Sequence, residues 1–280
     1  MSVKRFVKIA LAMTACLGLV AGCSGGADKA GKTSQGGDRA NSADAGKSLG
    51  DVQVYGAASL NTVLPEIGDA TVVKDHPGTK LLFNFNGSSS LVDEMAGGAP
   101  VDILLTADEK NMKKALEKNL VKDPQIFTAN TLVLVVPKGN PGAIKGFADG
   151  TLDGKKLVIC APEVPCGNAT AKLSELNNVK LAPVSEEQSV SDVLDKVASG
   201  EADAGVVYKT DAKLKADKVE VIEIPKADQV VNNYMIAVAA GAPNPEGAKA
   251  VLDAVMSDAG QAALEKYGFL PAAKISSAQK

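Results

Sequence analysis

The sequence is poor in the side chains from which many binding and active sites are built. Of its 280 residues, none is tryptophan, one is histidine and four are tyrosine. A metal centre that needs several histidines is therefore excluded, and an aromatic platform for a sugar is poorly supplied. The one histidine, His76, stands in the polar stretch KDHPGTK, and we expect it to lie in a surface loop.

Arginine is absent from residues 51–280, because the only two arginines are Arg5 and Arg39. Carboxylate ligands are often held by the two-pronged guanidinium group of arginine. A binder of amino acids or organic acids is therefore disfavoured. The formal net charge is −3, and removal of residues 1–22, which hold three cations and no acid, makes it −6. This charge argues against a nucleic-acid partner.

Motifs of common enzyme classes are also missing. The sequence has no G-x-S-x-G elbow, no phosphate-binding Walker loop and no dinucleotide glycine pattern. Serine residues without a usable histidine offer no ordinary catalytic triad. Cys160 and Cys166 are separated by five residues, whereas the usual redox motif has two. We therefore predict no catalytic residue, no metal and no cofactor, and keep a thiol-disulfide oxidoreductase using these cysteines as the alternative from another class.

The N-terminus has the pattern of an export signal. Basic residues are followed by a short apolar run that ends in small residues, LVAG, directly before Cys23. The stretch LVAGC resembles a bacterial lipobox, so we predict a signal peptide over 1–22 and a lipid on Cys23 that anchors the protein to the outer face of the cell membrane. An ordinary signal peptide with an incidental cysteine is the alternative. No other segment approaches the roughly 18 apolar residues of a membrane span.

Residues 24–50 contain almost no large apolar side chain, so we predict a flexible, lipid-anchored tether over 23–50 and a folded body from Asp51. In an exported protein the two cysteines of the body, Cys160 and Cys166, are expected to form a disulfide. Two free buried thiols remain the alternative, because spacing does not establish the geometry that a disulfide needs.

The body alternates short aliphatic runs with helical patterns, which predicts an α/β fold with substantially parallel sheets. In such sheets, ligands bind beyond the carboxyl ends of the strands, where helices begin. The runs expected to form strands are DVQVYGA, KLLFNF, VDILLTA, NTLVLVVP, KLVICAP, AGVVY, VEVIEIP and NNYMIAVAA.

Four junctions between a strand and a helix share small or hydroxyl-bearing residues. They lie at Ser59, at the triple serine 88–90, at Cys166 and at Ser189. Several helix N-termini that present free amides and hydroxyls toward one place would form an anion site.

Two of these helices carry the spacing of a capping box. Ser90 with Asp93, and Ser189 with Asp192, each place a serine three residues before an acid. We therefore expect Ser90 and Ser189 to cap their helices, which leaves the other serines of the triple run free for a ligand.

The sequence then resembles a known family along almost the whole body, from Asp51 to Phe269. The segments VYGAASLNTVLPEI, FNFNGSSSLVDEMAGGAPVDILLTADEKNMKKALEKNLV, PEVPCGNATAKL, GEADAGVVYKTDA and AVMSDAGQAALEKYGF resemble, in order, the motifs of the molybdate-binding component of ABC importers. The resemblance implies a two-lobed type II periplasmic-binding-protein fold with the ligand cleft between the lobes. It implies lobe one over 51–129 and 234–280, and lobe two over 130–233.

The resemblance also implies a set of residues for the site. Ser59, Ser88 and Tyr208 would give hydroxyl donors to a tetrahedral oxyanion, and Cys166 and Val190 would give backbone N–H groups. Cys166 departs from the alanine that the family commonly has there. The implied ligand is molybdate, with tungstate as a second ligand, and the implied partner is the permease of an ABC importer. We expect a monomer, and a receptor for sulfate, thiosulfate or another oxyanion is the alternative.

Overall fold

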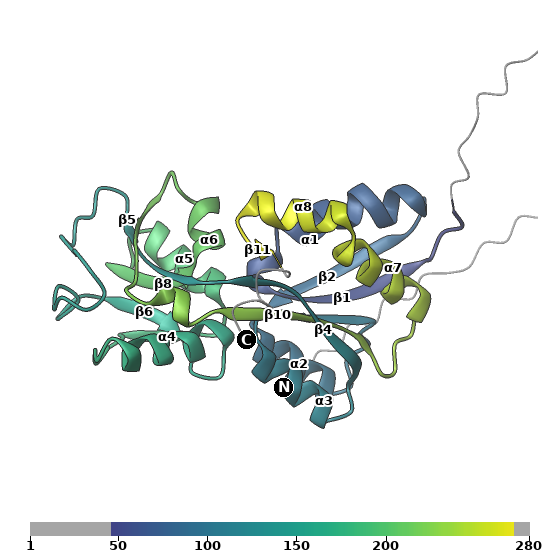
Figure 1. Ribbon diagram of the computed structural model, residues 1–280, viewed down its shortest axis with the longest axis horizontal. Coiled ribbons are helices and arrows are strands. Elements are labelled where there is room, and N and C mark those ends of the chain that lie inside the picture. The colour runs from purple at the N-terminus through teal and green to yellow at the C-terminus, as the bar shows by residue number, and fades with distance from the viewer. Residues whose placement is uncertain (1–45, 272–280) are drawn as a thin grey trace, which may run out of the picture. The chain divides into compact units, whose positions relative to one another are not determined.

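The structure is a computed structural model that describes residues 46–271 (Figure 1). The predicted signal peptide, Cys23 and most of the predicted tether lie outside the described residues. The residues just before Asp51 are held against the body, because Gly46 N–H donates to Asp75 O at 2.8 Å and Leu49 N–H to Thr79 Oγ1 at 2.9 Å. No helix within residues 46–271 combines the length and the apolar character that a membrane crossing needs.

The first sheet has six strands in the order β11-β4-β10-β3-β1-β2. Strand β1 runs parallel to both β2 and β3, whereas β10 runs antiparallel to β3 and β4. The strands are β1 (Asp51–Ala57), β2 (Lys80–Asn86), β3 (Ile103–Thr106), β4 (Val121–Asn130), β10 (Asn232–Ala239) and β11 (Leu270–Pro271).

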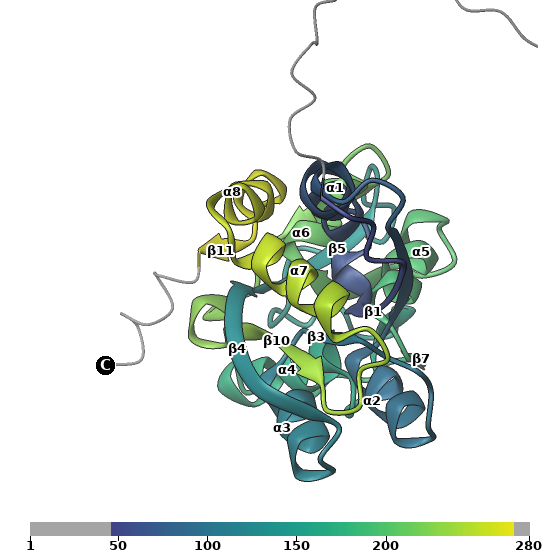
Figure 2. The same cartoon turned by 90° about the vertical axis from the view of Figure 1, so that its right-hand side faces the viewer.

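Helices cover both faces of this sheet, and we call the sheet with its helices lobe one. Two helices, α2 (Ser88–Ala96) and α3 (Glu109–Glu117), pack on one face. On the other face lie α1 (Val63–Gly68), α7 (Pro245–Met256) and α8 (Asp258–Tyr267), as both views show (Figures 1 and 2). Short helical turns η1 (Ala58–Leu60) and η2 (Asp69–Val73) flank α1.

The second sheet has five strands in the order β7-β6-β8-β5-β9. They are β5 (Leu132–Pro137), β6 (Leu157–Cys160), β7 (Ser185–Glu187), β8 (Ala204–Tyr208) and β9 (Val219–Ile222). One face carries α4 (Pro165–Leu176), and the other carries α5 (Val190–Ala198) and α6 (Lys209–Leu214), as Figure 1 shows. This sheet and its helices form lobe two.

The chain passes between the two sheets twice. It leaves the first sheet at the end of β4 and enters the second one two residues later at β5. It returns from β9 through η3 (Ala227–Gln229) to β10. The two crossings are neighbours, because Asn130 at the end of β4 pairs with Asn232 at the start of β10. The molecule is therefore a two-lobed α/β protein.

The expectation of substantially parallel sheets is correct for only part of each sheet. The parallel pairs are β1 with β2 and β3, and β6 with β7 and β8. The strands next to the crossings, β5 and β10, run antiparallel to their neighbours within their own sheets. The parallel strands of each sheet are joined through α-helices, as parallel neighbours require, whereas no α-helix lies between β4 and β5 or between β9 and β10.

Candidate functional site

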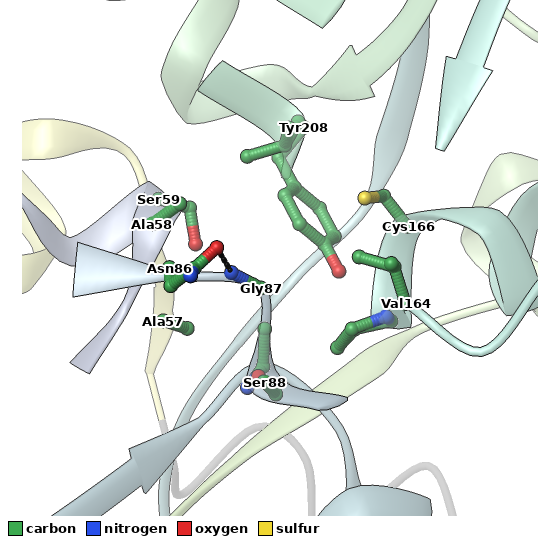
Figure 3. Close-up of a pocket in the computed structure, with 12 residues that line it drawn as sticks. Ala57, Ala58, Ser59, Asn86, Gly87, Ser88, Val164, Cys166 and Tyr208 are labelled. Atoms are coloured by element: carbon green, nitrogen blue, oxygen red, sulfur yellow. Dashed lines mark hydrogen bonds between the residues drawn. The ribbon is translucent and has the colours of Figure 1, made fainter. Parts of the chain in front are cut away.

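All five residues predicted for the ligand line one small pocket between the lobes. Figure 3 labels four of them, Ser59, Ser88, Cys166 and Tyr208. The space between the atoms of the pocket lining, including the part open to solvent, is about 190 Å³, which suits a small ion better than a sugar or a peptide. Its lining consists of Ala57, Ala58, Ser59, Asn86, Gly87, Ser88, Ala107, Val164, Pro165, Cys166, Val190 and Tyr208. None of these residues carries a formal charge.

Three helices begin at the pocket. Helix α2 of lobe one begins at Ser88, and helices α4 and α5 of lobe two begin at Pro165 and Val190. The first N–H groups of a helix have no partner within the helix, and the helix dipole gives that end a partial positive charge. The three N-termini therefore surround the pocket with donors and with a field that favours an anion.

The Ser88 hydroxyl is oriented from behind by the protein backbone. The N–H of Ala107, which follows β3, donates to Ser88 Oγ at 3.0 Å. Because a hydroxyl group has a single hydrogen, and this bond occupies a lone pair of the oxygen, the hydrogen of Ser88 remains available for a ligand. On the same side of the pocket, Ser59 Oγ lies 2.7 Å from Tyr234 Oη, so the Tyr234 phenol fixes the position of the Ser59 hydroxyl.

Tyr208 reaches the pocket from the end of β8, with its ring directed between the two lobes (Figure 3). Asn232 Nδ2 donates to Tyr208 Oη at 3.0 Å. Burial raises the pKa of Tyr208 well above its ordinary value, and burial raises the pKa of Tyr234 too. Both phenols therefore stay protonated at physiological pH and act as neutral hydroxyl groups.

The ring of Tyr234 is the centre of an aromatic cluster behind the pocket. It packs edge to face against Tyr208, Phe127 and Phe269, with ring centroids 5.8, 6.2 and 5.5 Å apart. These rings come from both lobes, and such contacts add to the energy of burying the rings. The cluster holds the two tyrosines in place without any charged group.

One acid lies behind Tyr208. Asp211 is buried, and this burial raises the pKa of its carboxyl group to about 7. Asp211 is not among the residues that line the pocket. A ligand in the pocket therefore meets no charged side chain.

The triple serine does not act as predicted in one respect. Helix α2 begins three residues earlier than a cap at Ser90 requires, its N-cap is Gly87, and no side chain caps it. The expected role of Ser90 as a cap is wrong, because Ser90 is already inside the helix. Ser88, the first helical residue, lines the pocket, so this serine faces the site rather than the helix end.

The other predicted cap is confirmed. Ser189 is the N-cap of α5, and its side chain accepts from the N–H of Asp192 at 3.3 Å while its hydroxyl donates to Asp192 Oδ2 at 2.7 Å. This reciprocal bonding fixes where α5 begins. It therefore positions Val190, the first helical residue, at the pocket.

Cys160 and Cys166 form a disulfide, with Cα atoms 5.7 Å apart. It joins the end of β6 to the first turn of α4, and both cysteines are buried. The two elements already approach closely, because a Cβ on Gly167 would lie 1.9 Å from Ala161 O. A redox enzyme needs a sulfur that its substrate can reach. The burial of this pair argues against the oxidoreductase alternative.

We predict that replacing both cysteines by alanine lowers stability and preserves anion binding. The two cysteines have a sequence separation of only six, so the closed loop is short and loss of the disulfide should cost about 2 kcal/mol, the lower end of the usual range. In a body of this size that is a fall of roughly 4 to 8 °C in melting temperature. Melting curves and calorimetric titration with molybdate measure the two effects. Loss of binding in a protein that still folds would show that sulfur contacts the ligand.

The lobes contact one another around the pocket. A Cβ on Gly87, the N-cap of α2, would lie 2.1 Å from Gln188 O of lobe two, so the two backbones approach closely there. At a second point Asn111 Nδ2 of α3 donates to Glu163 O at 3.2 Å. The structure therefore has the lobes closed over the pocket.

Several residues that shape the site were not predicted. Asn232 and Tyr234 lie behind the pocket and support Tyr208 and Ser59, whereas Gly87 and Ala107 belong to its lining. The asparagine-glycine pair at 86–87 was visible as a turn before the helix, and it is the one signal that could have indicated Gly87. Ala107 acts through its backbone, which no side-chain pattern reveals.

Within residues 46–271, no three histidine, cysteine, aspartate or glutamate side chains gather in a way that could hold a metal ion. A small uncharged pocket between two closing lobes, surrounded by helix N-termini, is the arrangement of a protein that binds a solute and encloses it. The chain belongs to the bacterial extracellular solute-binding proteins, since the model of that family matches residues 52–270.

Comparison with individual proteins narrows the class. Molybdate-binding protein ModA of Mycobacterium tuberculosis (strain H37Rv) is 40% identical over 219 residues, which cover 78% of this chain and 84% of that protein. The lipoprotein YvgL of Bacillus subtilis (strain 168), whose name assigns it to an ABC transporter as a substrate-binding protein, is 31% identical over 276 residues and 95% and 98% of the two chains. Within its family the chain is therefore ModA-like.

The fold agrees with a solved structure. The periplasmic molybdate-binding protein of Azotobacter vinelandii has a TM-score of 0.62 with 19% identity, over 78% of this chain and 98% of that chain. The family and the fold establish an extracytoplasmic solute-binding protein of the transport type, which is not an enzyme.

Proposed function

We propose that this protein binds molybdate, and also tungstate, and delivers the ion to the permease of an ABC importer. The observation that carries the proposal is the pocket itself, because its size suits a small ion and its lining offers hydroxyls and helix N-termini without a charged side chain. Fixed neutral donors can hold a dianion without a counter-charge. The names of the ModA relatives support molybdate as that dianion.

The direction of the hydrogen bonds supports a fully deprotonated ligand. Ser88 Oγ and Tyr208 Oη each accept a bond from behind, so each has its hydrogen left for the pocket. Hydrogenphosphate carries a proton that needs an acceptor, and no carboxylate lines the pocket to provide one. An unpaired buried donor costs about 1 to 3 kcal/mol. Phosphate should therefore bind weakly.

Sulfate is the second candidate, since it has the same charge and shape as molybdate but is smaller. Donors that are fixed on two lobes reach a smaller ion with longer bonds or with incomplete closure. We therefore propose a preference for the larger ions, and we propose that the protein needs no cofactor.

Melting the purified body, residues 46–280, with each ion at equal concentration tests the function. Ligand at about a thousand times its dissociation constant stabilises a fold by ~4.1 kcal/mol, and each kcal/mol is worth roughly 2 to 4 °C here. Molybdate and tungstate should raise the melting temperature on the order of ten degrees. Sulfate and phosphate should raise it much less. A large shift with phosphate, or none with molybdate, contradicts the proposal.

The proposal also states where in the cell the protein acts. Lipid on Cys23 would hold the protein, as a monomer, at the outer face of the membrane beside its importer, and the tether would let the body reach it. The lipoprotein name of YvgL supports this part. Membrane fractionation of a Cys23→Ala variant tests it.

A further inference from the structure

Asn232 connects the two lobes directly behind the pocket. It is 7% exposed and opens β10, at the point where the chain returns to lobe one. Its Nδ2 lies 3.0 Å from Ala107 O of lobe one, and 3.0 Å from Tyr208 Oη and 3.4 Å from Pro165 O of lobe two. One side chain therefore contacts three elements that form the site.

The chemistry of these partners determines which way the amide faces. The carbonyl oxygens of Ala107 and Pro165 can only accept hydrogen bonds, so the NH₂ group of Asn232, and not its oxygen, must face them. The NH₂ group has two hydrogens for three neighbours, so they serve the two contacts of 3.0 Å, Ala107 O and Tyr208 Oη, and Pro165 O at 3.4 Å shares one of them. The Tyr208 hydroxyl can donate or accept in other surroundings, but beside an NH₂ group it accepts.

This contact has a consequence for the hydrogen of Tyr208. A phenol has one hydrogen, and the bond from Asn232 occupies a lone pair of the oxygen, so this hydrogen is left for another acceptor. Because Tyr208 lines the pocket, a bound anion can be that acceptor. The same hydrogen-bond network includes Ser88 of lobe one, because the carbonyl of Ala107 accepts from Asn232 while the N–H of Ala107 donates to Ser88 Oγ at 3.0 Å.

We propose that Asn232 is a positioning residue that holds the Tyr208 hydroxyl as a donor to the bound anion and thereby selects fully deprotonated oxyanions. The inference rests on the proposed function, because it names Asn232 as the cause of the selectivity that the proposed function gives to this pocket. Without a donor at position 232 the Tyr208 hydroxyl can turn, and its oxygen can then present a lone pair to the pocket, where a protonated oxyanion can donate.

A double-mutant cycle tests whether Asn232 acts through Tyr208. The proteins are the full body with Asn232→Leu, Tyr208→Phe and both changes, each titrated calorimetrically with molybdate. A hydrogen bond to a charged group is worth about tenfold to a hundredfold in affinity. Asn232→Leu should therefore weaken binding about tenfold when Tyr208 is present, and less than about twofold in the Tyr208→Phe protein. An equal loss in both proteins would overturn the inference.

Asn233→Leu is the matched control. Asn233 is the next residue of β10, so its side chain points to the other face of the sheet, where it donates to Glu109 Oε1 at 3.3 Å. We expect it to leave the affinity for molybdate within about twofold. Melting curves without ligand separate any general loss of stability from the loss of binding.

The smaller change Asn232→Ala removes the donor without placing an oxygen against the carbonyls of Ala107 and Pro165, so it tests selectivity and keeps the inference testable if the leucine variant fails to fold. The phosphate dissociation constant divided by the molybdate dissociation constant should fall at least about tenfold, because one hydrogen bond to a charged group is worth about that factor in affinity. An unchanged ratio would overturn the inference while the proposed function stands. A wild-type protein that binds no molybdate rejects the proposed function, and the inference with it, before any variant is compared.

Discussion

Replacing Ser88 by aspartate should abolish molybdate binding, with a loss of at least a thousandfold. Ser88 is buried at the start of α2, and its hydroxyl faces the pocket. Two unit charges about 4 Å apart repel by roughly 4 kcal/mol at the effective dielectric constant of a protein site, and molybdate carries two charges. About 4 kcal/mol corresponds to a thousandfold in affinity. Calorimetric titration measures the change.

The fold should survive this substitution. A carboxylate at position 88 can still accept from the N–H of Ala107, and an acid in the first turn of a helix is favoured by the helix dipole. Ser88→Ala, which removes one hydroxyl without adding charge, should weaken binding only about tenfold to a hundredfold.

Ser90→Asp is the matched control for Ser88→Asp. Ser90 belongs to the same first turn of α2 but does not line the pocket, so the added charge should reduce affinity far less. If the Ser88→Asp protein binds molybdate within about tenfold of the wild type, the anion does not lie at this helix end.

A single methyl group on Gly87 should keep the lobes apart. The added Cβ of Gly87→Ala would lie 2.1 Å from Gln188 O, a backbone atom that cannot rotate away. Overpacking of this kind costs about 1 to 3 kcal/mol. Because Gly87 and Gln188 belong to different lobes, the cost falls on the closed arrangement rather than on either lobe. We expect about tenfold to a hundredfold weaker molybdate binding with little change in the melting temperature of the ligand-free protein.

Gly241→Ala serves as the control for Gly87→Ala. No atom lies within 4 Å of a Cβ at position 241, which is also in lobe one, so this change should leave binding unaltered. Small-angle scattering with and without molybdate would show whether the Gly87→Ala protein closes. A variant that binds and compacts like the wild type would show that the lobes accommodate the methyl group.

The sequence predicted the regular strands well and missed the irregular ones. The run DVQVYGA forms β1 over the same residues, Asp51–Ala57, because an apolar run between two turn signals has few alternatives. Strand β4 was not predicted, since VKDPQIFTAN holds Pro124 and two charged residues. Its neighbour β11 pairs only with Thr128 and Ala129. No strand on that side therefore needs a hydrogen bond from Pro124, which has no backbone N–H to donate.

The site was predictable to the extent that it consists of helix beginnings. Ser59, Ser88, Cys166 and Val190 each stand where a strand gives way to a helical turn, and the resemblance to a known family supplied Tyr208. The supporting residues were not predictable. Asn232 is more than 20 residues from Tyr208 and more than 100 from Ala107, so only the folded chain brings these three together.

The strand order implies a sequence of events when the chain folds. Lobe two has all of its strands in one uninterrupted segment, β5 to β9, so it can assemble as soon as that segment is available. Lobe one cannot, because β10 lies between β3 and β4 and comes about a hundred residues after β4. Until β10 arrives, the edges of β3 and β4 have no partner and are open to pairing with other chains.

Asn232 is the first residue of β10, so the contact that unites Ala107, Tyr208 and Pro165 is made only when that last central strand enters. The pocket is therefore among the last features to form. A partly folded chain would therefore lack the pocket until its two lobes were already complete.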